Sequence, residues 1–210
     1  MLNLNKSALL KTMKNKIKLG SCKKKTYRCN DANGYSNYMQ IAIDVAERQL
    51  IKQPHIGHEH EIPIGCVIVD NKTGKILAKS CNKTIKSNNS LQHAEIICMN
   101  RALKKLSTNR LTNCSMYITL EPCVMCAGAI MLSKIDRLYI GCLSKKTGAI
   151  ISNIHLFQRN ICNHIPDVYY GIMEQECKTL LRGFFRDINW PFSDTRHKQQ
   201  ILTKRNFFKK

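Results

Sequence analysis

The chain has 210 residues and a formal net charge of +20, a length that indicates one domain with a sizeable core. Its longest uninterrupted apolar stretch, Cys123–Leu132, is too short for a membrane span, which takes about 20 residues, so no membrane is expected. Eleven cysteines, an odd number, and an N-terminus that alternates lysine with apolar residues argue against a secreted disulfide scaffold and favour a reducing compartment.

The first predicted elements are a helix and a pair of strands. Apolar residues at helical spacing predict a helix from about residue 36 to 52. The continuous apolar run 63–69 predicts a buried strand, and the polar turn 71–74 leads into a second strand near 76–78. We expect these two strands to pair antiparallel.

Helices and strands then alternate, which predicts a layered α/β domain without internal repeats. The expected elements are a helix opening at His93, a strand at 116–120, a helix starting at Cys123, strands at 137–140 and 168–170, and a final helix at 174–188.

Two short motifs carry the chemistry. His93, Cys123 and Cys126 offer one imidazole and two thiolates, which suits a catalytic zinc ion with an open fourth position. Glu95 lies close enough to His93 to move protons beside that ion. Both motifs are expected at helix N-termini, whose partial positive charge favours thiolates, and Cys123 and Cys126 share one helix face.

Other interpretations of Cys123-x-x-Cys126 are a redox pair or half of a structural zinc finger. A finger needs a second ligand pair, and the sequence contains no second C-x-x-C and no H-x-x-x-H. A redox pair has no need of His93 or Glu95. The combined pattern is typical of zinc-dependent nucleobase deaminases.

The stretch from about Tyr38 to Phe185 resembles the bacterial-type tRNA-specific adenosine deaminases. The resemblance is carried by Glu61–Val67, Thr119–Ala129, Lys146–Ala149 and Glu176–Arg186, with Asn82 at the position of a base-contacting asparagine. It implies a three-layer α/β/α cytidine-deaminase-like domain around a five-stranded mixed sheet. It also implies one Zn²⁺ per subunit and a homodimer.

The activity implied is hydrolytic conversion of adenosine to inosine at the wobble position of tRNA anticodons, with Glu95 as the proton carrier. By resemblance, Asn82 holds the flipped base, and Ile64 and the Ala94 backbone line its pocket. Contacts to the anticodon stem-loop are expected from Ser144, Lys145, Lys146, Arg159, Asn163, His164, Phe184, Phe185 and Arg186. Because Phe184 and Phe185 share an apolar stripe with two leucines, at least one of them is expected in the core.

Some positions depart from the family. Asn89–Gln92 replaces the usual Asp-Pro-Thr-Ala, and Ser144 stands where an acidic residue commonly contacts ribose. A serine hydroxyl can still bond a 2′-hydroxyl. The cluster His55, His58 and His60 is interpreted as a solvated loop insertion, because the zinc site needs none of them.

The basic charge gathers at the two ends. Residues 1–30 contain nine basic and no acidic side chains, and residues 191–210 contain six basic side chains and one acidic. Such tails commonly contact a polyanion, although solvated ends would have the same composition. We divide the chain into a flexible extension (1–35), a deaminase domain (36–190) and a tail (191–210).

Three alternatives stay open. The domain could instead deaminate a free base, nucleoside or nucleotide such as cytidine, guanine or dCMP. It could be a catalytically silent zinc-binding RNA module, which an intact Glu95 disfavours. Residues 1–35 permit an RNA-binding arm or a targeting segment, so the expected location is cytoplasmic, with an organelle as the alternative.

Overall fold

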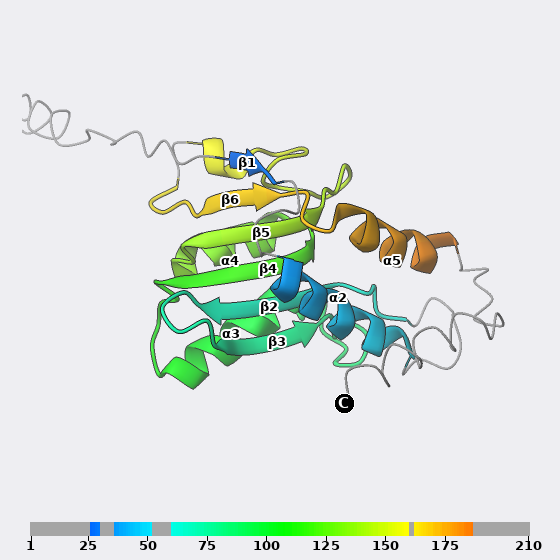
Figure 1. The fold of residues 1–210 in the computed structure, drawn as a ribbon, viewed down its shortest axis with the longest axis horizontal. Coiled ribbons are helices and arrows are strands. Elements are labelled where there is room, and N and C mark those ends of the chain that lie inside the picture. The colour runs from blue at the N-terminus through cyan, green and yellow to red at the C-terminus, as the bar shows by residue number, and fades with distance from the viewer. Residues whose placement is uncertain (1–25, 30–35, 52–59, 160–161, 187–210) are drawn as a thin grey trace, which may run out of the picture.

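A computed structural model describes residues 26–29, 36–51, 60–159 and 162–186, which form a sheet covered by helices (Figure 1). The strands lie in the order β1-β6-β5-β4-β2-β3. In chain order the elements are β1 (Thr26–Arg28), α2 (Ser36–Ile51), β2 (Gly65–Asp70), β3 (Ile76–Cys81), α3 (Ala94–Leu106), β4 (Cys114–Leu120), α4 (Val124–Ser133), β5 (Arg137–Cys142), η2 (Leu156–Gln158), β6 (Asp167–Tyr170) and α5 (Glu174–Arg186).

The sheet is mixed, as expected. Strand β2 pairs antiparallel with both β3 and β4, whereas β4, β5, β6 and β1 run parallel to one another. The residues of β2 from Gly65 to Val69 are buried, because helices cover both faces of the sheet at this strand. The predicted antiparallel pair of strands is therefore confirmed.

Helices α3 and α4 cover one face of the sheet, and α2 and α5 cover the other. Each face buries its own apolar cluster. The first contains Met99, Ile130 and Leu138, and the second contains Met39 and Ile172. The structure therefore has the three-layer α/β/α arrangement that the resemblance implied.

The prediction of five strands was wrong, because β1 adds a sixth. Its three residues follow a lysine run and carry no alternating pattern, so local sequence gives no strand signal. The pairing comes from β6: the Tyr27 and Tyr169 rings stack at 5.2 Å, and the Cys29 N–H donates to the carbonyl oxygen of Tyr170 at 2.9 Å. Strand β1 lies inside the predicted flexible extension.

The other predicted elements agree with the structure to within a few residues. The final helix is described as far as Arg186, and the termini 1–25 and 187–210 lie outside the described residues, so the predicted domain boundaries stay predictions. Within the described ranges, no helix is both long and apolar enough to span a membrane.

Candidate metal centre and active site

The starts of α3 and α4 bring the three predicted ligands together. His93 occupies the N-cap position of α3 and Cys123 that of α4, and Cys126 lies in the first turn of α4. The Nδ1 atom of His93 lies 3.7 Å from the Sγ atom of Cys123 and 3.5 Å from that of Cys126. All three ligand atoms lie within 4.8 Å of one another.

These separations fit a tetrahedral zinc ion. With Zn–S bonds of about 2.3 Å and Zn–N bonds of about 2.0–2.1 Å, two ligand atoms of a tetrahedron lie roughly 3.6 Å apart. Both nitrogen-to-sulfur distances at His93 match this spacing. The donor set is the one that zinc prefers in catalytic sites with an open position.

The two sulfurs differ in their proton affinity. The hydrogen bond with Cys126, aided by His93, lowers the pKa of Cys123 to about 4. The same sulfur–sulfur contact, together with burial, raises the pKa of Cys126. The contact with Cys123 also raises the pKa of His93. Together, the two cysteines and the His93 imidazole therefore hold protons that a divalent cation would displace.

Glu95 lies in the first turn of α3 and is only 3% exposed. Its Oε2 atom has no hydrogen-bond partner in the part of the chain that the structure describes. Burial raises the pKa of this carboxyl to about 7. A carboxyl that titrates near neutral pH can both accept and donate a proton during one reaction cycle.

Asn82 is buried beside the ligands. Its Oδ1 atom accepts a hydrogen bond from the Ala94 N–H at 2.8 Å, and its backbone carbonyl accepts one from Gln49 Nε2 at 2.8 Å. Because the Ala94 N–H can only donate, the amide orientation is fixed and Nδ2 remains as a donor. The Ala94 carbonyl accepts from Ser80 Oγ at 2.6 Å, and Ile64 packs against both apolar clusters.

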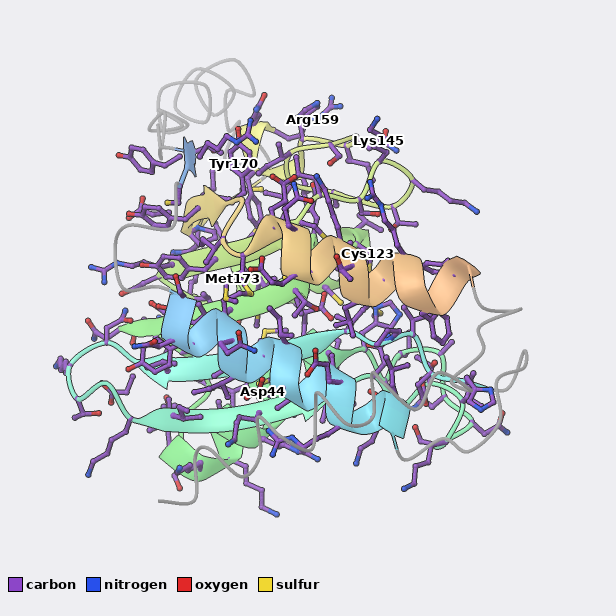
Figure 2. All side chains as sticks on the ribbon, turned by 45° about the vertical axis from the view of Figure 1, so that its right-hand side comes forward. Asp44, Cys123, Lys145, Arg159, Tyr170 and Met173 are labelled. Atoms are coloured by element: carbon purple, nitrogen blue, oxygen red, sulfur yellow. The ribbon has the colours of Figure 1, made fainter. Side chains whose placement is uncertain are left out.

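Three of the predicted RNA contacts follow β5. Ser144 is half-buried, with its Oγ atom 2.9 Å from Oγ1 of Thr147. Lys145 and Lys146 are exposed, as is Arg159 at the end of η2. Figure 2 shows Lys145 and Arg159 on the loops at the top of the view.

Asn163 and His164 are tied to the end of α4. Lys134 Nζ lies 3.0 Å from Asn163 Oδ1, and the Nε2 atom of His164 donates to the Ile135 carbonyl at 2.7 Å. This bond occupies one of the two ring nitrogens of His164. An RNA contact from His164 would therefore use the other nitrogen or the ring face.

Leu180 and Leu181 are buried, Phe184 is half-buried, and Phe185 is 57% exposed. The two phenylalanine rings meet edge to face at 5.3 Å. Phe185 therefore offers an exposed aromatic surface near the end of α5, where Arg186 is the last described residue.

The histidine cluster lies mostly outside the described residues. His55 and His58 belong to the undescribed segment 52–59, and His60 is half-buried. The interpretation as a loop insertion stays a prediction.

Sequence reasoning missed two buried carboxylates beside the site. Glu61 is 5% exposed and accepts hydrogen bonds from Thr84, Ile85 and Lys86 in the loop that follows Asn82. Glu121 is 2% exposed and accepts hydrogen bonds from backbone N–H groups in the loop after β5. Glu121 follows the apolar strand β4 and directly precedes Pro122, whereas Glu61 follows the polar run 58–60 and precedes Pro63 by two residues. An acidic residue at the end of the apolar strand β4 was the available signal for Glu121, because a buried carboxylate there needs several hydrogen-bond donors.

Comparison with known proteins places this geometry in a family. The family model described as the cytidine and deoxycytidylate deaminase zinc-binding region matches residues 33–142. A tRNA-specific adenosine deaminase of Rickettsia bellii (strain RML369-C) is 43% identical over 142 residues, which cover 67% of this chain and 98% of the relative. The chain belongs to the tRNA-specific adenosine deaminase family.

Solved structures agree with membership of the tRNA-specific adenosine deaminase family. A structure from studies of A-to-I editing by tRNA:A34 deaminases is 37% identical, with a TM-score of 0.63, and covers 70% of this chain and 99% of its own. A guanine deaminase from Nitrosomonas europaea is 18% identical, with a TM-score of 0.59, over 78% of this chain and 88% of its own. This second likeness shows the shared fold alone.

Proposed function

We propose that this protein is a zinc-dependent hydrolase that converts adenosine to inosine at the wobble position of tRNA anticodons. The observation that carries the proposal is the buried, unpartnered Glu95 carboxyl oxygen beside the converged ligands His93, Cys123 and Cys126. The family to which the chain belongs supports the choice of substrate.

The ligands named above would hold one Zn²⁺ per chain. When bound, zinc would supply a Lewis acid that makes water nucleophilic near neutral pH. Glu95 takes a proton from the attacking water and delivers it to N1 of the purine. After the hydroxyl oxygen bonds to C6, Glu95 takes the remaining proton of that hydroxyl and passes it to the amino group. The C6–N bond then breaks, C6–O becomes the carbonyl of inosine, and ammonia leaves.

The surroundings of the site support a single-stranded RNA substrate. Asn82 keeps its Nδ2 donor available for a base while its Oδ1 atom binds the Ala94 N–H. Ile64 would line the pocket that the resemblance implies. Exposed lysines after β5 and the exposed Phe185 ring offer charge for phosphates and a surface for stacking. An unpaired anticodon loop lets a base enter at small unstacking cost.

A homodimer is part of the proposal. Val124 and Leu132 on α4 are 53% and 67% exposed, and Gly128 between them faces open space. An apolar surface of this kind on a helix suits contact with a second copy. Light scattering on the purified protein measures the mass directly. The cytoplasmic location and its organelle alternative stay predictions.

The test compares substrates and one variant. The protein is incubated with an anticodon stem-loop that carries adenosine at the wobble position, and separately with cytidine, guanine and dCMP. We expect the wild-type protein to form inosine in the stem-loop. We expect Glu95→Ala to bind zinc and RNA but to form no inosine. Turnover of a free base or nucleotide with none of the RNA would favour the small-molecule deaminase. Equal RNA binding without inosine from either protein would favour the silent module.

A further inference from the structure

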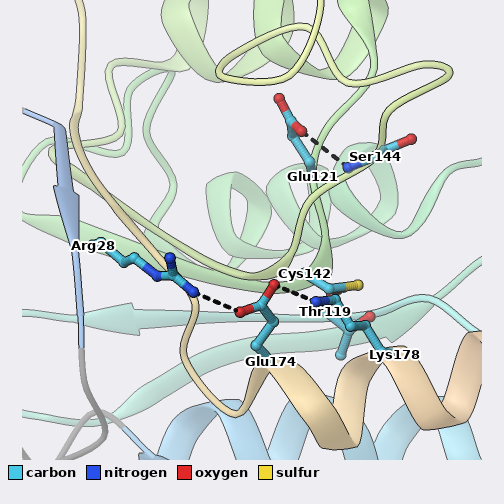
Figure 3. A network of polar contacts seen from close by, with 7 residues as sticks. All are labelled: Arg28, Thr119, Glu121, Cys142, Ser144, Glu174 and Lys178. Carbon is cyan, nitrogen blue, oxygen red and sulfur yellow. Dashed lines mark hydrogen bonds and ion pairs between the residues drawn. The ribbon is translucent and has the colours of Figure 1, made fainter.

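Glu121 is the residue between β4 and the zinc-ligand turn, and its carboxylate is enclosed by donors. Oε1 accepts hydrogen bonds from the backbone N–H groups of Ile150, Ile151 and Ser152 at 3.1, 2.6 and 3.0 Å. Oε2 accepts from the Ser144 N–H at 3.0 Å (Figure 3). It also accepts from the Ser152 hydroxyl. The carboxylate therefore holds both ends of the segment 144–152.

The segment closes tightly around this carboxylate. A Cβ atom at Gly148 would lie 2.3 Å from Oε2 of Glu121 and 2.5 Å from the carbonyl oxygen of Ser144, so no larger residue fits without displacement. The next residue, Ala149, donates its N–H to the Pro122 carbonyl at 3.0 Å. Pro122 precedes Cys123, so the segment is attached to the turn that carries a zinc ligand.

The exposed part of the segment carries charge. Lys145, Lys146 and Thr147 lie between the two anchored ends and are exposed. The hydroxyl contact between Ser144 and Thr147 closes this part further. Holding two lysines in place before RNA arrives lowers the entropic cost of binding. A loop that is anchored only by the backbone of its flanking strands would lack this restraint.

We propose that Glu121 is a positioning residue, which fixes the segment 144–152 against the zinc-ligand turn so that Lys145 and Lys146 are preset for the anticodon stem-loop. This role rests on the proposed function for its substrate. It assigns to Glu121 an effect on RNA binding, exerted through the two lysines, and no contact with the reacting base.

The first measurement needs no substrate. Glu121→Gln keeps the shape of the side chain but replaces one acceptor oxygen with a donor, which then faces N–H groups. We expect limited trypsin digestion of the full chain to cut after Lys145 or Lys146 several times faster in Glu121→Gln than in wild type. Zinc content should stay at the wild-type level. Equal cleavage rates would overturn the proposal.

The second measurement is kinetic. On the stem-loop, Glu121→Gln should raise KM roughly tenfold while kcat changes by less than about threefold, since preorganisation is lost and the chemistry is not. In a Lys145→Ala/Lys146→Ala background, the same change should raise KM by less than about twofold, because coupled residues are non-additive. The same roughly tenfold rise of KM in that background, or a loss of both kcat and bound zinc in Glu121→Gln, would overturn the positioning role.

If Glu121→Gln does not fold, Ser152→Ala replaces it in both measurements. It removes one hydroxyl donor and leaves the backbone donors in place, so the same changes should appear at a smaller size. Wild-type inactivity on RNA would count against the proposed function, whereas the trypsin result tests the anchoring of the segment independently of it.

Discussion

The amide oxygen of Asn82 accepts the N–H of Ala94 at 2.8 Å, so the loop after β3 is tied to the first residue of α3. His93 directly precedes Ala94, and the bond therefore fixes the position of a zinc ligand as well as that of the asparagine. Since Oδ1 is used in this way, the Nδ2 donor is the part of Asn82 that is left for a substrate base.

Replacing Asn82 with aspartate separates these two roles. Asn82→Asp keeps an acceptor for the Ala94 N–H but removes the Nδ2 donor. We expect a folded, zinc-bound protein whose kcat/KM on the stem-loop falls about 10- to 100-fold, as for the loss of one buried hydrogen bond of about 1–3 kcal/mol. Asn82→Ala should lose thermal stability as well. Full activity of Asn82→Asp would show that Nδ2 does not contact the base.

Sequence patterns were sufficient to predict that His93, Cys123 and Cys126 lie together, because a zinc-ligand set depends on local spacing. Cys123 and Cys126 share a helical turn, and His93 and Glu95 lie within one short motif, so each half could be located alone. His93 and Cys126 are 33 residues apart in the chain, and the strand β4 leads back from α3 to the zinc-ligand turn. The apolar run of β4 was also recognisable in the sequence.

Other features depend on partners far along the chain. Strand β1 exists because Tyr27 and Arg28 meet Tyr169 and Glu174, more than 140 residues later, and three residues hold no pattern of their own. Four of the donors to Glu121 are backbone N–H groups, which nearly every residue carries. Apart from the Ser152 hydroxyl, the donors therefore leave no trace in the sequence.

Loss of one ligand should abolish metal binding. Cys126→Ser replaces a buried thiolate ligand with a hydroxyl that zinc binds poorly, so we expect the zinc content to fall from about one ion per chain to near zero. Elemental analysis of the dialysed protein measures this. Cys162→Ser, which changes a half-buried cysteine outside the ligand set, should retain the ion. Zinc retained by Cys126→Ser would exclude Cys126 as a ligand.

The next prediction concerns the free energy of unfolding and the contact between α2 and strand β2. A Cβ atom at Gly65 would lie 1.9 Å from the carbonyl oxygen of Ala42, which cannot move without shifting the helix. We expect Gly65→Ala to lower the free energy of unfolding by about 3 kcal/mol or more in urea titrations.

The matched control is Gly128→Ala in α4, where a Cβ atom would meet nothing within 4 Å. Alanine is favoured over glycine inside helices by roughly 0.5–1 kcal/mol, so this change should leave the stability of the single chain equal or slightly higher. Similar losses from both variants would argue against the close α2–β2 contact as the cause.

The ion pairs at the start of α5 make one pH-dependent contribution. Glu174 contacts Lys178 at 2.6 Å and Arg28 at 3.4 Å, and these contacts lower the pKa of its carboxyl below the usual 4.5. A lowered pKa means that the stabilisation is fully present above pH 4.5 and is lost as the pH falls through the lowered value. Partial exposure limits its size to about 0.5–1 kcal/mol.

Glu174→Gln should therefore have a lower thermal midpoint than wild type at pH 7. The difference between the two midpoints should disappear as the pH falls toward 3. Glu176→Gln is the control, because Glu176 lies in the same turn and has no ion-pair partner among the described residues. A difference that persists unchanged at pH 3 would show that the carboxylate charge is not its source.

The most direct measurement is mass spectrometry of tRNA after incubation with the zinc-loaded wild-type protein. Exchange of an amino group for oxygen raises the mass of one nucleoside by about one dalton, and nuclease fragments locate the change. We predict this gain at the wobble adenosine of the anticodon, and its absence with Glu95→Ala. Unmodified wobble adenosine, together with turnover of a free base or nucleotide by the same sample, would contradict the account.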